Sequence, residues 1–239
     1  FNPKVLIAGC GTGKQVAKAT SYQNASIMAI DLSINSLSYA KRKIDEIGYK
    51  GLEFLQGDIL HLKSLNKKFD VIECVGVLHH MNEPLAGLKV LVDLLEPHGF
   101  LKLGLYSEIS RKHIIALREF IKKKSFSSNK NDIRNFREKI LNHNDDKLFQ
   151  KVVHNYDFYS LSSTRDLIFH VQEHRYTIPE ISKILKNFKL EFLGFANPFF
   201  QKKYSQSFPD DKKNLSLDNW NQFEINNPDA FKGMYQFWV

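Results

Sequence analysis

Short apolar runs alternate with amphipathic segments along the first half of the chain. The runs are continuous, which is typical of strands that are buried on both faces of a parallel sheet. They occur at Val5–Ala8, Ser26–Ile30, Leu52–Leu55, Phe69–Cys74 and Phe100–Tyr106. Apolar residues at helical spacing predict helices at Lys14–Thr20, Asn35–Ile47 and Pro84–Leu95. This alternation predicts an α/β fold with a doubly wound, mostly parallel sheet.

The pattern changes after residue 110. Ile114–Lys124 predicts a helix, Ser125–Asp146 is polar, and Tyr156–His174 is rich in aromatic residues and histidine. A long stretch of this kind inside a compact domain is often functional, so we interpret residues 111–176 as an inserted helical lid over a binding site. The α/β pattern then resumes with a helix at Pro179–Phe188, a strand at Leu190–Phe195, a helix at Leu217–Phe223 and a strand at Met234–Val239.

Three glycines form a loop directly after the first predicted strand. Gly9, Gly11 and Gly13 follow the pattern G-x-G-x-G, whereas a dinucleotide fold needs a glycine at position 14 or 16, where Lys14 and Val16 stand. The loop precedes a helix, whose N-terminus offers free N–H groups and a partial positive charge. A compact ligand with a carboxylate and an amino group fits this loop better than a pyrophosphate, and a tight turn without a ligand is the alternative.

Two carboxylates follow the second and third predicted strands. Asp31 can accept hydrogen bonds from both hydroxyls of a ribose, or it can cap the helix that begins near Ser33. Asp58 can accept from an exocyclic amine such as that of adenine, with the Ile59 N–H suited to a ring nitrogen, or it can be a solvated turn residue. Because ligands of doubly wound sheets lie beyond the carboxyl ends of the strands, both residues stand where a nucleoside would bind.

Residues 4–106 resemble the cofactor half of the Rossmann-like, class I S-adenosylmethionine-dependent methyltransferases. The resemblance is carried by five segments in order, namely Val5–Gly13, Ala29–Ser33, Gln56–Ile59, Phe69–Met81 and Leu94–Gly99. It implies a seven-stranded sheet with an antiparallel last strand. It also implies that S-adenosylmethionine is held by residues of these segments, which are Gly9, Cys10, Gly11, Gly13, Asp31, Leu32, Asp58, Ile59, Cys74 and Val75. Ala8 departs from the family, in which an acidic residue often stands before the first glycine.

The family resemblance gives the predicted segments their roles. We expect one methyltransferase domain over residues 1–239, with a cofactor-binding half at 1–110, the lid at 111–176 and the C-terminal part of the sheet at 177–239. Residues 157–175 also resemble a subgroup of bacterial methyltransferases of unassigned substrate. We further expect a missing upstream domain, because the chain starts at Phe1 and a strand begins almost at once.

Methyl transfer requires alignment, and it requires a base only where the acceptor must lose a proton. His79 and His80, after the fourth strand, and Tyr106, at the end of the fifth, are the candidates for such chemistry. The alternatives are that the histidines cap a turn or line the cofactor pocket, and that Tyr106 only packs.

Polar and aromatic side chains of the lid predict one wall of an acceptor pocket. The predicted wall consists of Tyr156, Tyr159, Arg165, His170, His174 and Arg175. Arg165 and Arg175 favour an anionic acceptor, because guanidinium groups pair with carboxylates. His170-x-x-Glu173-His174 also matches an inverted zinc-peptidase motif; the motif is short and no third ligand follows, so we expect no metal.

Composition narrows the remaining choices. The net charge is +8, but the 34 basic residues are mostly scattered lysines, which does not favour nucleic-acid binding. No apolar run is long enough to cross a membrane. Cys10 and Cys74 are expected to be free thiols in a reducing compartment, so we expect a cytoplasmic protein. The leading interpretation is methyl transfer to a small molecule; a protein or RNA methyltransferase and an inactive cofactor-binding scaffold are the alternatives.

Overall fold

The computed structural model of the chain describes residues 2–142, 147–170 and 172–239. Its centre is a seven-stranded sheet with the order β3-β2-β1-β4-β5-β7-β6. Strands β1 to β5 are mutually parallel, and β7 runs antiparallel to both β5 and β6. The predicted doubly wound sheet with an antiparallel last strand is therefore confirmed. The strands are β1 (Lys4–Ala8), β2 (Ser26–Asp31), β3 (Leu52–Gln56), β4 (Phe69–Val75), β5 (Leu95–Tyr106), β6 (Gly194–Phe195) and β7 (Met234–Trp238).

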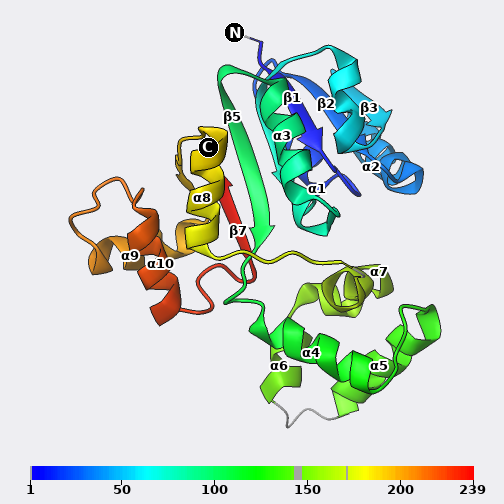
Figure 1. Cartoon of the computed structure of the whole chain (residues 1–239). Coiled ribbons are helices and arrows are strands. Elements are labelled where there is room, and N and C mark those ends of the chain that lie inside the picture. Colours follow the sequence, from blue (N-terminus) through cyan, green and yellow to red (C-terminus); the bar gives the residue numbers. More distant parts are fainter. Residues whose placement is uncertain (1, 143–146, 171) are drawn as a thin grey trace.

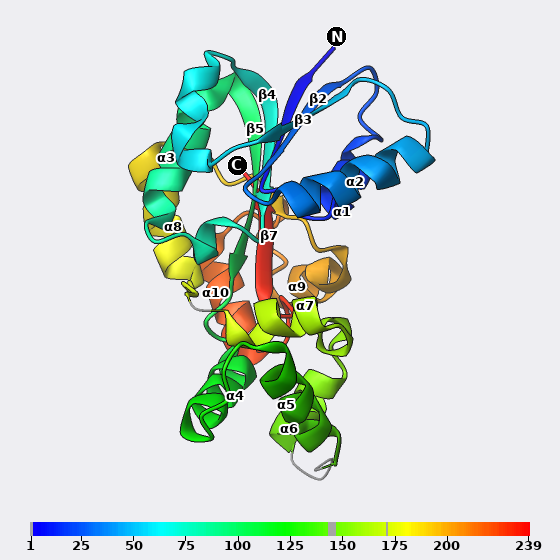
Figure 2. The same cartoon turned by 90° about the vertical axis from the view of Figure 1, so that its right-hand side faces the viewer.

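Helices cover both faces of the sheet (Figure 2). Alternate residues of β1 show why: Val5 and Ile7 belong to one hydrophobic cluster, and Leu6 and Ala8 to another. The first cluster packs under α1 (Lys14–Ala19) and α2 (Ile34–Glu46), the second under α3 (Pro84–Leu94) and α8 (Ile178–Phe188). Helices α9 (Gln201–Ser207) and α10 (Leu217–Asn226) pack at the β6–β7 edge, where Trp220 contacts Phe195.

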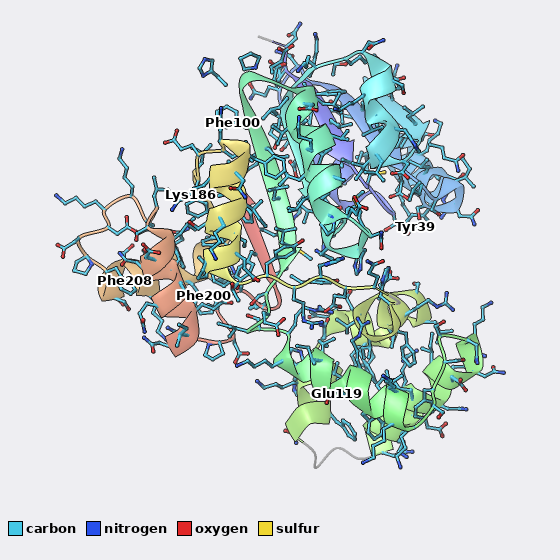
Figure 3. All side chains as sticks on the ribbon, in the orientation of Figure 1. Tyr39, Phe100, Glu119, Lys186, Phe200 and Phe208 are labelled. Atoms are coloured by element: carbon cyan, nitrogen blue, oxygen red, sulfur yellow. The ribbon has the colours of Figure 1, made fainter. Side chains whose placement is uncertain are left out.

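The segment between β5 and α8 folds separately from the sheet, as a group of helices beyond the carboxyl end of β5 (Figure 1). We call residues 112–169 the helical insertion. Its helices are α4 (Lys112–Lys123), α5 (Lys130–Asn142), α6 (Lys147–Val153) and α7 (Leu161–Thr164), with a 3-10 turn at Tyr156–Tyr159 and a π-helical turn at Arg165–Phe169. Apolar side chains such as Ile114, Phe136 and Phe158 give the insertion a hydrophobic core of its own. Figure 3 shows its side chains, with Glu119 marking α4.

The chain leaves the sheet for the insertion and returns to it at neighbouring positions. Ser107 forms a parallel bridge with Tyr176, and the Tyr176 N–H donates to the Tyr106 carbonyl at 2.9 Å. The Glu108 N–H donates to the Tyr176 carbonyl at 2.9 Å, and the His174 N–H donates to the His79 carbonyl at 2.8 Å. The points where the chain leaves the sheet and returns to it are therefore both held at the carboxyl ends of β4 and β5.

Several elements differ from their predicted bounds. Strand β6 is only Gly194–Phe195 instead of Leu190–Phe195, because the left-handed φ of +125° at Gly194 bends the chain into the sheet there. Strand β5 begins at Leu95, which pairs with Phe69 next to an irregularity in the register, so α3 ends one residue earlier than expected. Helix α5 lies in the stretch described only as polar. Among the described residues, no helix is long and apolar enough to span a membrane.

Candidate active site

A cavity of about 680 Å³ lies at the carboxyl ends of the central strands. One wall is formed by Gly9 and Gly11, which follow β1, and by Asp31, the last residue of β2. Another is formed by residues at the ends of β4 and β5, among them His80, which follows β4, and Tyr106, the last residue of β5. The helical insertion closes the opposite side, and Lys232–Met234, at the start of β7, close the rim. Ligand pockets of proteins commonly have volumes in this range.

Glycine is needed at the three loop positions for different physical reasons. A Cβ on Gly9 would lie 2.3 Å from Val77 Cγ2, and one on Gly13 would lie 2.8 Å from Ala40 Cβ, so both are required by close packing. A Cβ on Gly11 would meet nothing within 4 Å. Gly11 has a φ of +52°, which favours glycine, and it opens onto the cavity. The loop is therefore a turn that also leaves room for a ligand.

Asp31 holds the loop and faces the cavity at the same time. Its Oδ2 accepts a hydrogen bond from the Gly11 N–H at 2.7 Å, and its Oδ1 accepts from the Ser33 N–H at 2.8 Å. Each carboxylate oxygen retains a further lone pair, so two hydroxyls can still donate to it. The cap of α2 is Ser33, whose side chain accepts from the Ser36 N–H, and not Asp31.

A second, smaller pocket of about 100 Å³ adjoins Asp31. It is lined by Leu32, Asp58 and Ile59, together with Gly9 and Val77. Asp58 also caps the 3-10 helix Ile59–Leu65, since its side chain accepts from the Leu60 N–H at 2.9 Å. The open loop, the ribose-type acceptor Asp31 and this side pocket fit a nucleoside with a short tail.

Neither predicted cysteine is among the residues that line the cavity or the side pocket. Cys10 and Cys74 are free and buried, and burial raises the pKa of each thiol to about 12, so both stay neutral. The cavity wall after β4 is formed by Gly76 and Val77, the residues next to the predicted Cys74 and Val75. Cys10 lies under the loop, between the residues Gly9 and Gly11 that face the cavity.

His79 and His80 follow β4 but have different surroundings. His79 is 0% exposed, and neither of its ring nitrogens has a hydrogen-bond partner among the described residues. A backbone group of Gly104 lies near the ring but outside hydrogen-bonding geometry, and burial lowers the pKa of His79 to about 2. His79 stacks on Tyr106 with ring centroids 3.6 Å apart. It is a packing residue beneath the cavity.

His80 lines the cavity and has a defined tautomer. Its Nδ1 lies 3.0 Å from the Gln172 carbonyl, and since a carbonyl only accepts, Nδ1 carries the proton. Burial lowers the pKa of His80 to about 4, against the opposing effect of this hydrogen bond. The ring is therefore neutral near pH 7, and Nε2 carries a free lone pair. His170 also lines the cavity, with its ring centroid 3.8 Å from that of His80.

Both faces of the Tyr106 ring are covered. His79 stacks on it, and the guanidinium carbon of Arg111 lies 3.6 Å from the ring centroid, which requires the opposite face. Only the ring edge and the hydroxyl can reach the cavity, which Tyr106 lines. Burial raises the pKa of the Tyr106 hydroxyl, so it is protonated at neutral pH.

Arg111 and Glu173 form a buried ion pair that sequence reasoning did not identify. Arg111 Nη2 lies 2.8 Å from Glu173 Oε2, and Arg111 Nε donates to Oε1 at 3.1 Å. Arg118 and Arg175 contact the same carboxylate at 3.2 and 3.5 Å. Arg175 additionally pairs with Glu108 at 2.7 Å. Glu173 thus binds three guanidinium groups. Arg118 belongs to the insertion, Arg111 directly precedes it and Arg175 follows it.

The structure brings only part of the predicted acceptor wall to the cavity. His170 lines it, whereas Tyr156 is 95% exposed and Tyr159 is 55% exposed. Arg165 Nε donates to the Ser128 carbonyl at 3.2 Å. The acidic and polar residues of the insertion that do line the cavity are Asn155, Asp157, Ser163 and Asp166, which the sequence did not single out.

The described residues of the H-x-x-E-H motif lie outside the helices. The π-helical turn ends at Phe169, and Gln172–Arg175 form no regular structure. His174 Nε2 lies 3.2 Å from Gln172 Nε2, while Glu173 is committed to arginines. Within residues 2–142, 147–170 and 172–239, no group of three or more His, Cys, Asp or Glu side chains could hold a metal ion.

Comparisons with known proteins agree with this geometry. The model of the family described as methyltransferase domain matches residues 2–152. The protein syc1184_c of Synechococcus sp. is 37% identical over 121 residues, which are 50% of this chain and 29% of that protein. The ubiquinone biosynthesis O-methyltransferase of Aliivibrio fischeri is 26% identical over 118 residues, 49% of this chain and 50% of that protein. The chain thus spans half or less of the length of these relatives.

A solved structure shares nearly the whole fold. PKMT2 from Rickettsia typhi matches 99% of this chain and 48% of its own, with a TM-score of 0.72 and 20% identity. Its complex with AdoHcy gives the same TM-score at 18% identity. The shared fold therefore includes the helical insertion. Since the family match covers more than half of the chain, and the loop, Asp31 and the side pocket fit the cofactor, the chain belongs to the methyltransferase domain family as a class I S-adenosylmethionine-dependent methyltransferase.

Proposed function

We propose that this protein transfers a methyl group from S-adenosylmethionine to a small-molecule acceptor held under the helical insertion. The observation that carries the proposal is the shared cavity, in which the glycine loop forms one wall and the insertion the opposite one. The likeness to the ubiquinone biosynthesis O-methyltransferase of Aliivibrio fischeri supports a small acceptor. Two buried free thiols support a reducing, cytoplasmic location.

Different residues would hold the ribose, the base and the methionine end of the cofactor. Asp31 would accept from the ribose hydroxyls, Leu32, Asp58 and Ile59 would surround the base, and the backbone at Gly9, Gly11 and Gly76 would lie along the methionine end. When bound, S-adenosylmethionine supplies an electrophilic methyl group on a sulfonium. The protein then contributes mainly alignment, and positioning of this kind can supply most of the rate enhancement.

His80 is the base we propose for an acceptor that must lose a proton. Its Nε2 has a free lone pair, the ring lines the cavity, and the Gln172 carbonyl fixes the ring through Nδ1. The Tyr106 hydroxyl can orient the acceptor by a hydrogen bond. His79 would act only by supporting the Tyr106 ring from below.

The anionic acceptor that Arg165 and Arg175 favoured is not part of the proposal. Arg175 is paired with Glu108 and Glu173, and Arg165 is directed at the Ser128 carbonyl. Neither lines the cavity.

A protein acceptor is the second candidate function. Tyr156 is 95% exposed and is the chain neighbour of Asn155 and Asp157, two residues that line the cavity. Phe199, also exposed, is near Lys232 at the rim. Exposed aromatic residues of this kind are common where a protein partner docks.

Two measurements test the proposed function. Isothermal titration calorimetry with S-adenosylhomocysteine should show binding. Incubation with radiolabelled S-adenosylmethionine and a cell extract should then place the label in the small-molecule fraction; label in the protein fraction would favour the second candidate, and binding without any transfer would favour an inactive scaffold.

The His80→Asn variant separates chemistry from binding. It should bind S-adenosylhomocysteine as the wild type does but turn over about 10²- to 10⁴-fold more slowly, the range expected for loss of a general base. Turnover that is unchanged would assign the proton to another group.

A further inference from the structure

The insertion presents two carboxylates to the cavity. Asp157 belongs to the 3-10 turn Tyr156–Tyr159, and Asp166 to the π-helical turn Arg165–Phe169. Both line the same cavity as Gly9, Gly11 and Asp31. Among the described residues, neither side chain forms a hydrogen bond or an ion pair. They are therefore negative groups of the acceptor side whose hydrogen-bonding capacity is unused.

The charge of Asp157 acts on Asp166, and both carboxylates act on the Tyr106 hydroxyl. Desolvation raises the pKa of Asp166, His170 and Arg165 oppose this, and the charge of Asp157 adds to the rise. Asp157 and Asp166 are nevertheless both exposed residues, so water still hydrates their carboxylates. Both carboxylates also raise the pKa of the Tyr106 hydroxyl, after the larger effect of burial and against Arg111. Asp157, Asp166 and Tyr106 therefore face a common space.

The uncharged side chains near the two carboxylates offer lone pairs, and the cation beside them is already paired. His80 is neutral with its Nε2 lone pair free, and the covered Tyr106 ring offers only its edge and its hydroxyl oxygen. Arg111 lines the cavity, but its guanidinium is paired through two bonds with Glu173 and donates to the Leu167 carbonyl. Lys232 is exposed at the rim, with its Nζ 5.0 Å from the centroid of the Phe199 ring.

An ammonium group satisfies this set of side chains. It carries a positive charge for the carboxylates and N–H donors for Asp157, Asp166 and Tyr106 Oη. A carboxylate acceptor would meet two like charges and, among the described cavity residues, no guanidinium that lacks a carboxylate partner. A neutral hydroxyl would offer the two carboxylates one hydrogen-bond donor and no positive charge.

We infer that the methyl acceptor is an aliphatic amine, which enters the cavity as its ammonium form between Asp157, Asp166 and the Tyr106 hydroxyl. The inference rests on the proposed function, because it names the acceptor class of the same cavity. The ammonium first loses one proton, which His80 Nε2 relays to bulk solvent, because a ring with a pKa of about 4 does not retain it. The nitrogen lone pair then forms the N–CH₃ bond while the S–CH₃ bond breaks with its electron pair left on sulfur, and the product is a methylated ammonium.

Binding of probe amines tests the inference without relying on turnover. With S-adenosylhomocysteine at saturation, the affinities of n-butylamine, n-butanol and butyrate are measured by saturation-transfer nuclear magnetic resonance. The ammonium probe should bind about tenfold or more tightly than the neutral one, and butyrate weakest. Equal or tighter binding of butanol or butyrate would overturn the inference.

Two variants and a matched control assign the binding to the carboxylates. Asp166→Asn and Asp157→Asn should each weaken n-butylamine binding about three- to tenfold, as for partly exposed charge pairs. Asp210→Asn, which changes an exposed carboxylate in the turn after α9, should leave it unchanged. If one variant does not fold, the other variant and the wild-type probe series still decide.

The same titrations distinguish binding of the acceptor from binding of the cofactor tail. Variants that weaken S-adenosylhomocysteine binding but not amine binding would place Asp157 and Asp166 on the ammonium of the cofactor tail, which would overturn the inference. If the wild type does not bind S-adenosylhomocysteine, the proposed function fails; if it binds and no amine preference appears, only the inference on the acceptor fails. A comparison of n-butylamine with Nα-acetyl-lysine methylamide distinguishes a free amine from a lysine side chain as the source.

Discussion

Replacing Glu173 by glutamine is expected to destabilise the protein strongly. Glu173 has a fully buried side chain that accepts two hydrogen bonds from Arg111, one from Arg118 and one from Arg175. Glutamine keeps the shape of the side chain but replaces one acceptor oxygen by an NH₂ donor. That donor would face guanidinium donors, and three cations would lose their common anion.

The magnitude follows from what each arginine retains. Breaking a buried ion pair by removing one partner costs about 3–5 kcal/mol. Arg175 keeps Glu108, and the Arg118 side chain, at 24% exposure, can still reach water. Arg111, at 5% exposure, retains among the described residues the Leu167 carbonyl and the Tyr106 ring but no carboxylate, so most of the cost falls on it. We therefore expect the lower end, a loss of about 3 kcal/mol in the free energy of unfolding.

Urea unfolding followed by circular dichroism measures this loss, with Glu108→Gln as the matched control. The Glu108 side chain is 43% exposed and its pair with Arg175 is a surface pair, so the control should lose about 1 kcal/mol or less. A loss for Glu173→Gln no larger than that of the control would refute the reasoning, because it would show that the three guanidinium groups do not depend on the buried carboxylate.

Three further substitutions test the cofactor loop and the layer beneath the cavity. Asp31→Ala should weaken S-adenosylhomocysteine binding about 10- to 100-fold by calorimetry, since a charge-assisted hydrogen bond contributes roughly 1.5–3 kcal/mol; unchanged affinity would mean that the ribose lies elsewhere. Gly9→Ala puts a Cβ 2.3 Å from Val77 Cγ2 at a φ of +73°, so urea unfolding should show a loss of about 2–4 kcal/mol, and adding Val77→Ala should restore only the steric part. The wild type should melt at lower temperature as the pH falls below about 6.5, because unfolded histidine binds a proton that burial denies to His79, whose pKa is about 2. His79→Phe keeps a ring on Tyr106 and should make this dependence shallower, while His80 and His113, whose pKa values burial also lowers, maintain the rest; equal slopes at pH 5–7 for both proteins would contradict it.

The sheet was predictable because its strands are short apolar runs that end at residues typical of turns. The insertion was harder to predict, because α5 presents only Ile133, Phe136 and Ile140 to its core within an Asn/Lys-rich stretch. Strand β6 is defined by two residues that pair with Phe237 and Trp238, and a local apolar run does not reveal where such pairing begins.

The cofactor site was more accessible to sequence reasoning than the acceptor site. Asp31 is the last residue of β2, and Gly11 and Asp58 lie within three residues of the ends of β1 and β3, so local order along the chain fixes their place. The pairing of Arg111 with Glu173, by contrast, joins residues 62 positions apart and has no local signature.

The crossing points of the insertion have a consequence for how such proteins can diverge. The chain leaves the sheet at Ser107 and re-enters it at Tyr176, and these two residues are bridged to each other. The entropic cost of closing a loop between adjacent anchor points rises only slowly with loop length. The stability of the sheet therefore depends little on how many residues lie between the two anchors. Acceptor preference can then change by exchange of the cassette between these anchors while the nucleoside site is inherited intact. A chimaera that carries a relative's cassette between these anchors should therefore keep its affinity for S-adenosylhomocysteine.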